Sequence, residues 1–121
     1  MAFPTISIKT TNYTLTPNLQ VLIEQKFAPL DKFLDDRNES FCEIELEKIG
    51  DQQSGKIFRA EVNLENGGKL YRAESTEDQM EQAIDVVKNE VRAELQRAHG
   101  KRQSLVRRGG QALKNMLRFG R

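Results

Sequence analysis

The chain has 121 residues, of which 37% are hydrophobic and 31% charged, with a formal net charge of +1. This length suits one domain with one core. No apolar run approaches the roughly 20 residues that cross a bilayer. The first residues also lack a basic region followed by an apolar stretch. We therefore expect a cytoplasmic protein with no secretory signal and no membrane contact. Cys42 is the single cysteine, so it forms no intrachain disulfide.

The N-terminal third predicts a strand followed by a helix. Residues 5–10 alternate apolar and polar side chains and are rich in β-branched residues, which is typical of a strand. Thr16 is placed to cap a helix, and Pro17 suits the first helical position. Apolar residues then recur at helical spacing over 19–34. Pro29 removes one backbone hydrogen bond within this pattern, so we expect a kink there.

Three strands follow in sequence. Residues 41–49 and 58–64 alternate clearly, and residues 70–75 do so less regularly. Asn66-Gly67-Gly68 predicts a tight hairpin because these residues tolerate positive φ. Cys42 falls at an inward position and is interpreted as a small buried hydrophobe. The outward residues of the first of these strands form an acidic face that we expect to be solvated: Glu43, Glu45 and Glu47.

A long amphipathic helix closes the pattern. Thr76, with Gln79 three residues on, resembles a capping box. Apolar residues then mark one face of a helix over 80–98, and Gly100 is the expected end. Residues 112–119 have the spacing of a further short helix.

The element order is therefore β-α-β-β-β-α. Consecutive antiparallel strands with two helices on one face predict an α+β, two-layer domain. We assign the domain to residues 1–101 and a basic tail to residues 102–121, either flexible or forming a short helix.

Charge is distributed unevenly along the chain. From Lys88 to Arg121 there are ten basic and two acidic residues, a net charge of +8, whereas residues 1–87 carry −7. A basic segment on an otherwise acidic chain favours a polyanionic partner such as nucleic acid. The alternative is a solvated basic tail that aids solubility.

The chain contains an ordered set of short strings: Leu15-Thr16-Pro17, Phe27-Ala28-Pro29-Leu30-Asp31-Lys32-Phe33, Asn66-Gly67-Gly68, Glu77-Asp78 and Ala83-Ile84-Asp85. This set resembles the short bacterial ribosome hibernation promoting factors and the ribosome-associated inhibitors of the protein Y family. The resemblance covers about residues 5–101 and implies a fold similar to a double-stranded-RNA-binding domain, extended by an N-terminal strand. It also implies binding to the small ribosomal subunit and its rRNA, over the tRNA and mRNA sites. There the protein would block initiation and stabilise inactive ribosomes under stress.

The resemblance also implies RNA-binding positions, from which this chain departs in part. Lys26 and Lys32 match basic positions of the first helix, and Arg97 and Lys101 match basic positions late in the second. Pro29 stands where a lysine is common. The other departures are Glu90 and Ala93, at positions where the second helix usually offers Lys and Arg.

The charge pattern adds further candidates. Arg92 could replace the cation that is missing at Ala93. It lies one residue away, which turns its side chain by about 100° around the helix. Lys88 neighbours it one turn before and could equally snorkel at the core boundary. Arg97 could instead pair with Glu94. The remaining candidates lie in the tail, which is alternatively a disordered segment with incidental affinity: Arg102, Arg107 and Arg108.

The sequence offers little for catalysis, metal binding, a cofactor or a small-molecule substrate. His99 is the only histidine, and with Cys42 alone it cannot build a Cys/His zinc site. No phosphate-cradling glycine motif occurs. We therefore predict a binding protein, monomeric off the ribosome. Two alternatives stay open: another structured-RNA or ribosome-maturation protein, and a protein-interaction module.

Overall fold

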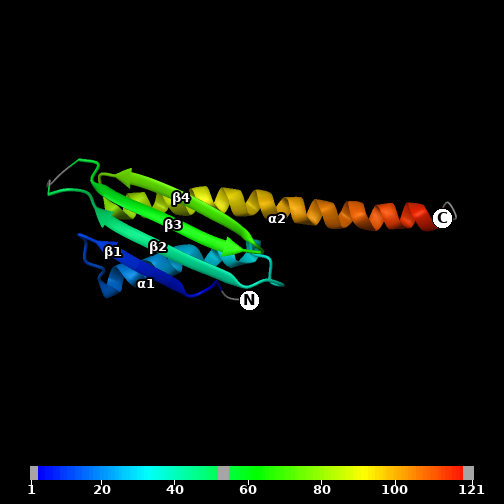
Figure 1. Cartoon of the computed structure of the whole chain (residues 1–121), viewed down its shortest axis with the longest axis horizontal. Coiled ribbons are helices and arrows are strands. Elements are labelled where there is room, and N and C mark those ends of the chain that lie inside the picture. Colours follow the sequence, from blue (N-terminus) through cyan, green and yellow to red (C-terminus); the bar gives the residue numbers. More distant parts are fainter. Residues whose placement is uncertain (1–2, 52–54, 119–121) are drawn as a thin grey trace.

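The computed structural model describes the backbone of residues 3–51 and 55–118, and the side chains of residues 3–51 and 55–105. A four-stranded sheet forms one layer, and the helices lie against one of its faces (Figure 1). The predicted α+β two-layer architecture is confirmed. In chain order the elements are β1 (Ile6–Thr11), α1 (Pro17–Phe27), the 3-10 helix η1 (Ala28–Phe33), β2 (Ser40–Lys48), β3 (Phe58–Asn66), β4 (Lys69–Glu77) and α2 (Met80–Arg118).

The sheet has the strand order β1-β2-β3-β4. β1 runs parallel to β2, with Ile6 opposite Cys42, so α1 and η1 form the crossover that parallel pairing needs. β2, β3 and β4 form an antiparallel meander. Gly67 and Gly68 connect β3 to β4 with φ of +62° and +77°, the backbone of a two-residue type I′ turn. The predicted hairpin is therefore confirmed.

The core lies between the sheet and the helices. Inward residues of β2, β3 and β4 alternate with outward ones, as the period of a strand requires. Cys42 is 3% exposed, and burial raises the pKa of its thiol to about 12, so the thiol stays protonated. The residues of α2 that close the core recur at helical spacing: Met80, Ala83, Ile84, Val87, Val91 and Leu95.

The first helix begins and ends for local reasons. The backbone N–H of Leu19 donates to Thr16 Oγ1 at 3.2 Å, and Pro17 occupies the first turn, which confirms the predicted cap. α1 ends at Phe27, one residue before Ala28-Pro29 opens η1. Pro29 has no N–H to continue the α-helical ladder. The expected kink therefore takes the form of a change from α-helix to 3-10 helix.

The second helix begins at Met80, where the predicted apolar pattern starts, but its predicted cap and its predicted end are wrong. Thr76 does not cap it, because Thr76 pairs with Arg59 inside β4 and α2 begins only at Met80. Gly100 does not end it, because α2 continues to Arg118 with Gly100 in helical conformation. The boundary drawn between residues 101 and 102 thus falls inside α2, whose C-terminal half projects past the sheet (Figure 1).

A buried amide ties the hairpin to the segment after η1. Asn66 is 3% exposed, yet its side chain has a full set of partners. Its Oδ1 accepts from the Asp35 N–H at 2.8 Å, and its Nδ2 donates to the Asp35 carbonyl at 3.1 Å and to Ser40 Oγ at 2.8 Å. This satisfied polar group fixes the loop that leads from the helical layer into β2.

The outward face of the sheet carries an ion-pair network centred on Arg59. Its guanidinium contacts Glu74, Glu45 at 2.9 Å, Glu61 at 2.6 Å and Glu47 at 3.3 Å. Burial by itself lowers the pKa of Arg59, but the hydrogen bonds with these carboxylates outweigh burial and raise it. Of the three glutamates expected to be solvated, Glu45 and Glu47 therefore pair with Arg59, and Glu43 is in no ion pair among the described residues.

We expect Arg59→Met to lower the free energy of unfolding by about 1–3 kcal/mol, because it leaves several partly buried carboxylates without a donor. Chemical denaturation measures the loss. The control is Arg72→Met, which removes one 2.7 Å contact with Glu61 from a side chain that is 59% exposed. That change should cost less than about 1 kcal/mol. Equal losses in the two variants would contradict a network centred on Arg59.

Candidate nucleic-acid interface

The candidate cations of α2 lie on two flanks of one helix. Successive helical residues turn by about 100°. Asp85 marks the flank toward α1, because it accepts Lys26 Nζ at 2.6 Å. Lys88 and Arg92 follow Asp85 by three and seven residues and share this flank. Lys88 is half-buried and Arg92 is exposed. The half-burial of Lys88 agrees with a side chain at the core boundary.

The second flank faces the β3–β4 hairpin. Arg97 and Lys101 are one turn apart, and both are exposed. Lys101 lines a concavity of about 240 Å³ together with Gly67 and Lys69 of the hairpin region. Arg97 forms no ion pair with Glu94 in the described part of the chain, so the alternative pairing is not observed. The structure therefore separates Arg97 and Lys101 from Lys88 and Arg92.

Two of the candidates have partners within the protein. Lys26 is tied to Asp85, and its side chain is only 23% exposed. Arg102 donates from Nη2 to the Phe33 carbonyl at 2.8 Å, which joins α2 to the last residue of η1. The guanidinium thereby donates to one of the carbonyls that a helix end leaves unsatisfied. Lys26 and Arg102 therefore hold the helical layer together, which their sequence positions did not reveal.

Lys32 remains accessible on η1. It is exposed, and its Nζ lies 5.2 Å from the centroid of the neighbouring Phe33 ring. The side chains of Arg107 and Arg108 lie outside the described residues, although the backbone of α2 passes through both positions. Within the described part of the chain, four candidate cations are exposed and outside any ion pair: Lys32, Arg92, Arg97 and Lys101.

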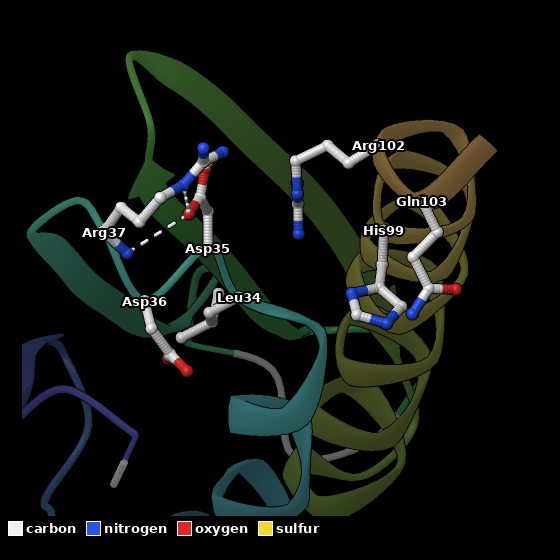
Figure 2. Close-up of a pocket in the computed structure, with 7 residues that line it drawn as sticks. All are labelled: Leu34, Asp35, Asp36, Arg37, His99, Arg102 and Gln103. Atoms are coloured by element: carbon white, nitrogen blue, oxygen red, sulfur yellow. Dashed lines mark hydrogen bonds and ion pairs between the residues drawn. The ribbon is translucent and has the colours of Figure 1, made fainter. Parts of the chain in front are cut away.

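A shallow hollow of about 640 Å³ lies where α2 passes the loop after η1. Figure 2 shows His99, Arg102 and Gln103 reaching from α2 toward the segment from Leu34 to Arg37. His99 also meets the Phe33 ring edge to face, with centroids 5.9 Å apart. His99 thus packs at the joint between the helices, at a position inside α2 and not at its end.

Arg37 is the basic residue of this hollow that sequence reasoning missed. Its Nε donates to Asp35 Oδ1 at 3.0 Å, although the Arg37 side chain is 81% exposed. Hydrogen bonds from the Arg37 side chain and backbone, with a smaller Coulombic contribution from Arg102, hold the pKa of Asp35 at about 2. Residues 35–38 form a short polar stretch between the first helical pattern and the next strand, and such a stretch gives no signal for this pairing.

Two carboxyls with lowered pKa make stability depend on pH. Burial by itself raises the pKa of Glu61, but hydrogen bonds from Arg59 and Asn63 and the charge of Arg72 lower it overall. A carboxyl whose pKa is lower in the folded state stabilises the fold above its unfolded pKa and loses this contribution as the pH falls through the folded value. We expect the free energy of unfolding to decline from about pH 4.5 toward pH 2. Denaturant titrations at successive pH values measure this, and constant stability between pH 5 and 2 would contradict it.

The outward face of the sheet and the C-terminal part of the chain carry opposite charge. The outward positions of the sheet hold six glutamates and three basic residues, a net charge of −3. Beyond Glu94 the chain has eight basic residues and no acidic one. Most of these basic residues belong to the second half of α2, which projects past the sheet (Figure 1). The sheet residues are Lys9, Arg59 and Arg72 with Glu43, Glu45, Glu47, Glu61, Glu65 and Glu74.

The described residues hold no group of three or more His, Cys, Asp or Glu side chains arranged to bind a metal ion. Over the same residues, no helix combines the length and apolar character that a bilayer span requires.

One family model matches most of the chain, and solved structures share its fold. Residues 6–103 match the family described as Sigma 54 modulation protein / S30EA ribosomal protein. The sequence matches none of the curated proteins with which it was compared. The N-terminal domain of Protein Y from Thermus thermophilus has a similar structure, with a TM-score of 0.65 and 24% identity over 78% of this chain and 98% of that one. A ribosomal subunit interface protein from Coxiella burnetii gives a TM-score of 0.60 and 16% identity over 78% and 97% of the two chains.

Proposed function

Because the chain belongs to the Sigma 54 modulation protein / S30EA ribosomal protein family, we propose that it binds the small ribosomal subunit and inhibits translation. It acts in the bacterial cytoplasm as a binding protein, without a cofactor. By occupying rRNA at the tRNA and mRNA sites, it stabilises inactive ribosomes under stress. One similar structure is a ribosomal subunit interface protein, which supports the choice of the ribosome as partner.

The observation that carries the proposal is the set of exposed, unpaired cations on α2 and η1. Lys32, Arg92, Arg97 and Lys101 are accessible among the described residues, and no acid follows Glu94 in the sequence. Lysine and arginine on helices bind phosphate oxygens, and such contacts position a protein on RNA without reading its sequence. An inhibitor that acts by blocking a site needs no sequence-specific contacts, because phosphate contacts are enough to hold it over that site.

The two flanks of α2 give this binding a geometry. Arg92 lies on the flank toward α1, and Arg97 and Lys101 lie on the flank toward the hairpin. A helix with cations on both flanks contacts two separate RNA segments when it inserts between them. Arg107 and Arg108 continue the same helix beyond the domain and extend the contact. We therefore propose that α2 inserts as a wedge between two rRNA segments, while the acidic sheet faces away from them.

Competition with tRNA tests the inhibitory mechanism. Small subunits carrying mRNA and labelled initiator tRNA are titrated with the protein, and tRNA retained on filters is counted. We expect saturable release of tRNA, and no release with a variant that reverses Lys32, Arg92, Arg97 and Lys101 to Glu. Binding to the subunits without loss of tRNA would contradict the inhibitory step. If the protein binds only free structured RNA, or binds a protein at high salt after nuclease treatment, one of the alternative functions replaces the proposal.

A further inference from the structure

The open face of the sheet ends in an exposed apolar pair beside two free carboxylates. Phe41 and Leu70 are 60% and 53% exposed, and both lie opposite Glu65 in the strand register. Glu43 follows Phe41 by two residues on the same face. Neither Glu43 nor Glu65 is in an ion pair with another described residue, unlike the carboxylates around Arg59.

These side chains line a hollow. Phe41, Leu70, Glu43 and Glu65 surround about 730 Å³ of open space at one end of the sheet. A surface with two large apolar side chains and two unpaired carboxylates is complementary to a segment that combines apolar and basic residues. The C-terminal part of the protein carries such a segment.

The C-terminal part of α2 has the matching composition. Residues 105–118 contain four basic residues and no acidic one. Their apolar residues Leu113, Met116 and Leu117 recur at helical spacing. The helix also includes Gly109-Gly110, and each glycine costs about 1 kcal/mol relative to alanine in a helix interior.

A helical segment of this kind gains stability from a surface against which it packs. Helices of fewer than about 12–15 residues are marginal in water without tertiary contacts. Figure 1 shows the C-terminal half of α2 projecting past the sheet and the other helices. Because α2 is continuous and its N-terminal half packs on the opposite face of the sheet, the segment cannot return to the open face of its own chain. An open sheet face that binds this segment would therefore belong to another copy.

We propose that the open sheet face, centred on Phe41 and Leu70, binds the C-terminal helical segment, residues 105–118, of a second copy of this chain. The dimensions agree. Fourteen helical residues span about 21 Å, and a nine-residue strand such as β2 spans about 30 Å. Each copy offers one sheet face and one helical segment, so a two-fold symmetric dimer satisfies both. This proposal differs from the sequence-based expectation of a monomer off the ribosome.

The test uses the full chain without ribosomes, so its outcome is independent of the proposed function. A synthetic peptide of residues 105–118 is titrated into isotopically labelled, dilute full-length protein, and amide chemical shifts are followed. We expect the changes to cluster at Phe41, Glu43, Glu65 and Leu70. Binding should weaken in high salt, because the contacts include exposed charges. A peptide of scrambled sequence should bind at least about tenfold more weakly, the loss of about 1.4 kcal/mol.

Sedimentation velocity of the full chain provides the second arm. We expect a concentration-dependent dimer, and the double variant Phe41→Thr/Leu70→Thr should raise its Kd at least about tenfold. Threonine keeps the strand propensity at both positions. The control is Val21→Thr, which removes apolar surface from a side chain of α1 that is 49% exposed. A monomer at every concentration, peptide shifts elsewhere, or a dimer that persists in the double variant would each overturn the proposal.

Discussion

A variant with Lys32, Arg92, Arg97 and Lys101 all changed to Glu is expected to lose small-subunit binding by at least about a hundredfold. These are the exposed candidate cations without an ion pair among the described residues. Each phosphate contact releases counterions, and four lost contacts reduce the slope of log K against log salt by about 3–4 units. Affinity for small subunits measured at several salt concentrations therefore gives the loss of binding. The change in salt slope shows whether lost phosphate contacts cause it.

The control for this prediction separates the site from net charge. Arg97→Gln/Lys101→Gln and Lys9→Gln/Lys56→Gln each remove two positive charges, but Lys9 is on the sheet and Lys56 precedes β3. The first pair should weaken binding about tenfold or more, and the second should leave it within about twofold. Equal effects of the two pairs would assign binding to overall charge and reject α2 as the contact surface. Unchanged thermal unfolding in each variant shows that the fold is intact.

Replacement of Phe27 by alanine is expected to lower the free energy of unfolding by about 3–5 kcal/mol. Phe27 is fully buried where α1 changes into η1, and its ring lies 6.1 Å from that of Phe3. A cavity there removes the packing that holds both helical segments against the sheet. Domains of this size are stable by about 5–15 kcal/mol, so the loss is a large fraction of the total.

Denaturant unfolding measures this loss, with a matched change on the same helix as the control. Val21 is 49% exposed, so Val21→Ala should change stability by less than about 0.5 kcal/mol. If Phe27→Ala were as mild as Val21→Ala, the α1–η1 junction would not be part of the core. The variant also loosens the attachment of Lys26 and Lys32, so RNA affinity should fall near its melting temperature.

Local patterns were sufficient to predict most of the fold. The alternation of residues 41–49 and 58–64, the cap at Thr16 and the Gly67-Gly68 turn each depend on neighbours within a few positions. The parallel pairing of β1 with β2 could not be predicted in this way. It joins residues far apart in the chain, and no local pattern specifies which edge of the sheet β1 occupies.

The end of α2 was predicted wrongly for a physical reason. Gly100 is tolerated in a helix at a cost of about 1 kcal/mol, and the contact of Arg102 with the Phe33 carbonyl stabilises the helix just beyond it. That contact joins residues 69 positions apart, so the sequence alone cannot reveal it. The same holds for Lys26, whose 2.6 Å pairing with Asp85 spans 59 positions. Sequence reasoning therefore found the basic residues but could not tell accessible cations from those with structural partners.

The most direct test of the central claim is co-sedimentation of the purified protein with small subunits, large subunits and intact ribosomes, at low and high salt. If the protein binds the small subunit, we expect it to sediment with particles that contain this subunit and not with isolated large subunits. This binding should be lost as the salt concentration rises. Absence of binding to every particle, or equal binding to large and small subunits, would contradict it.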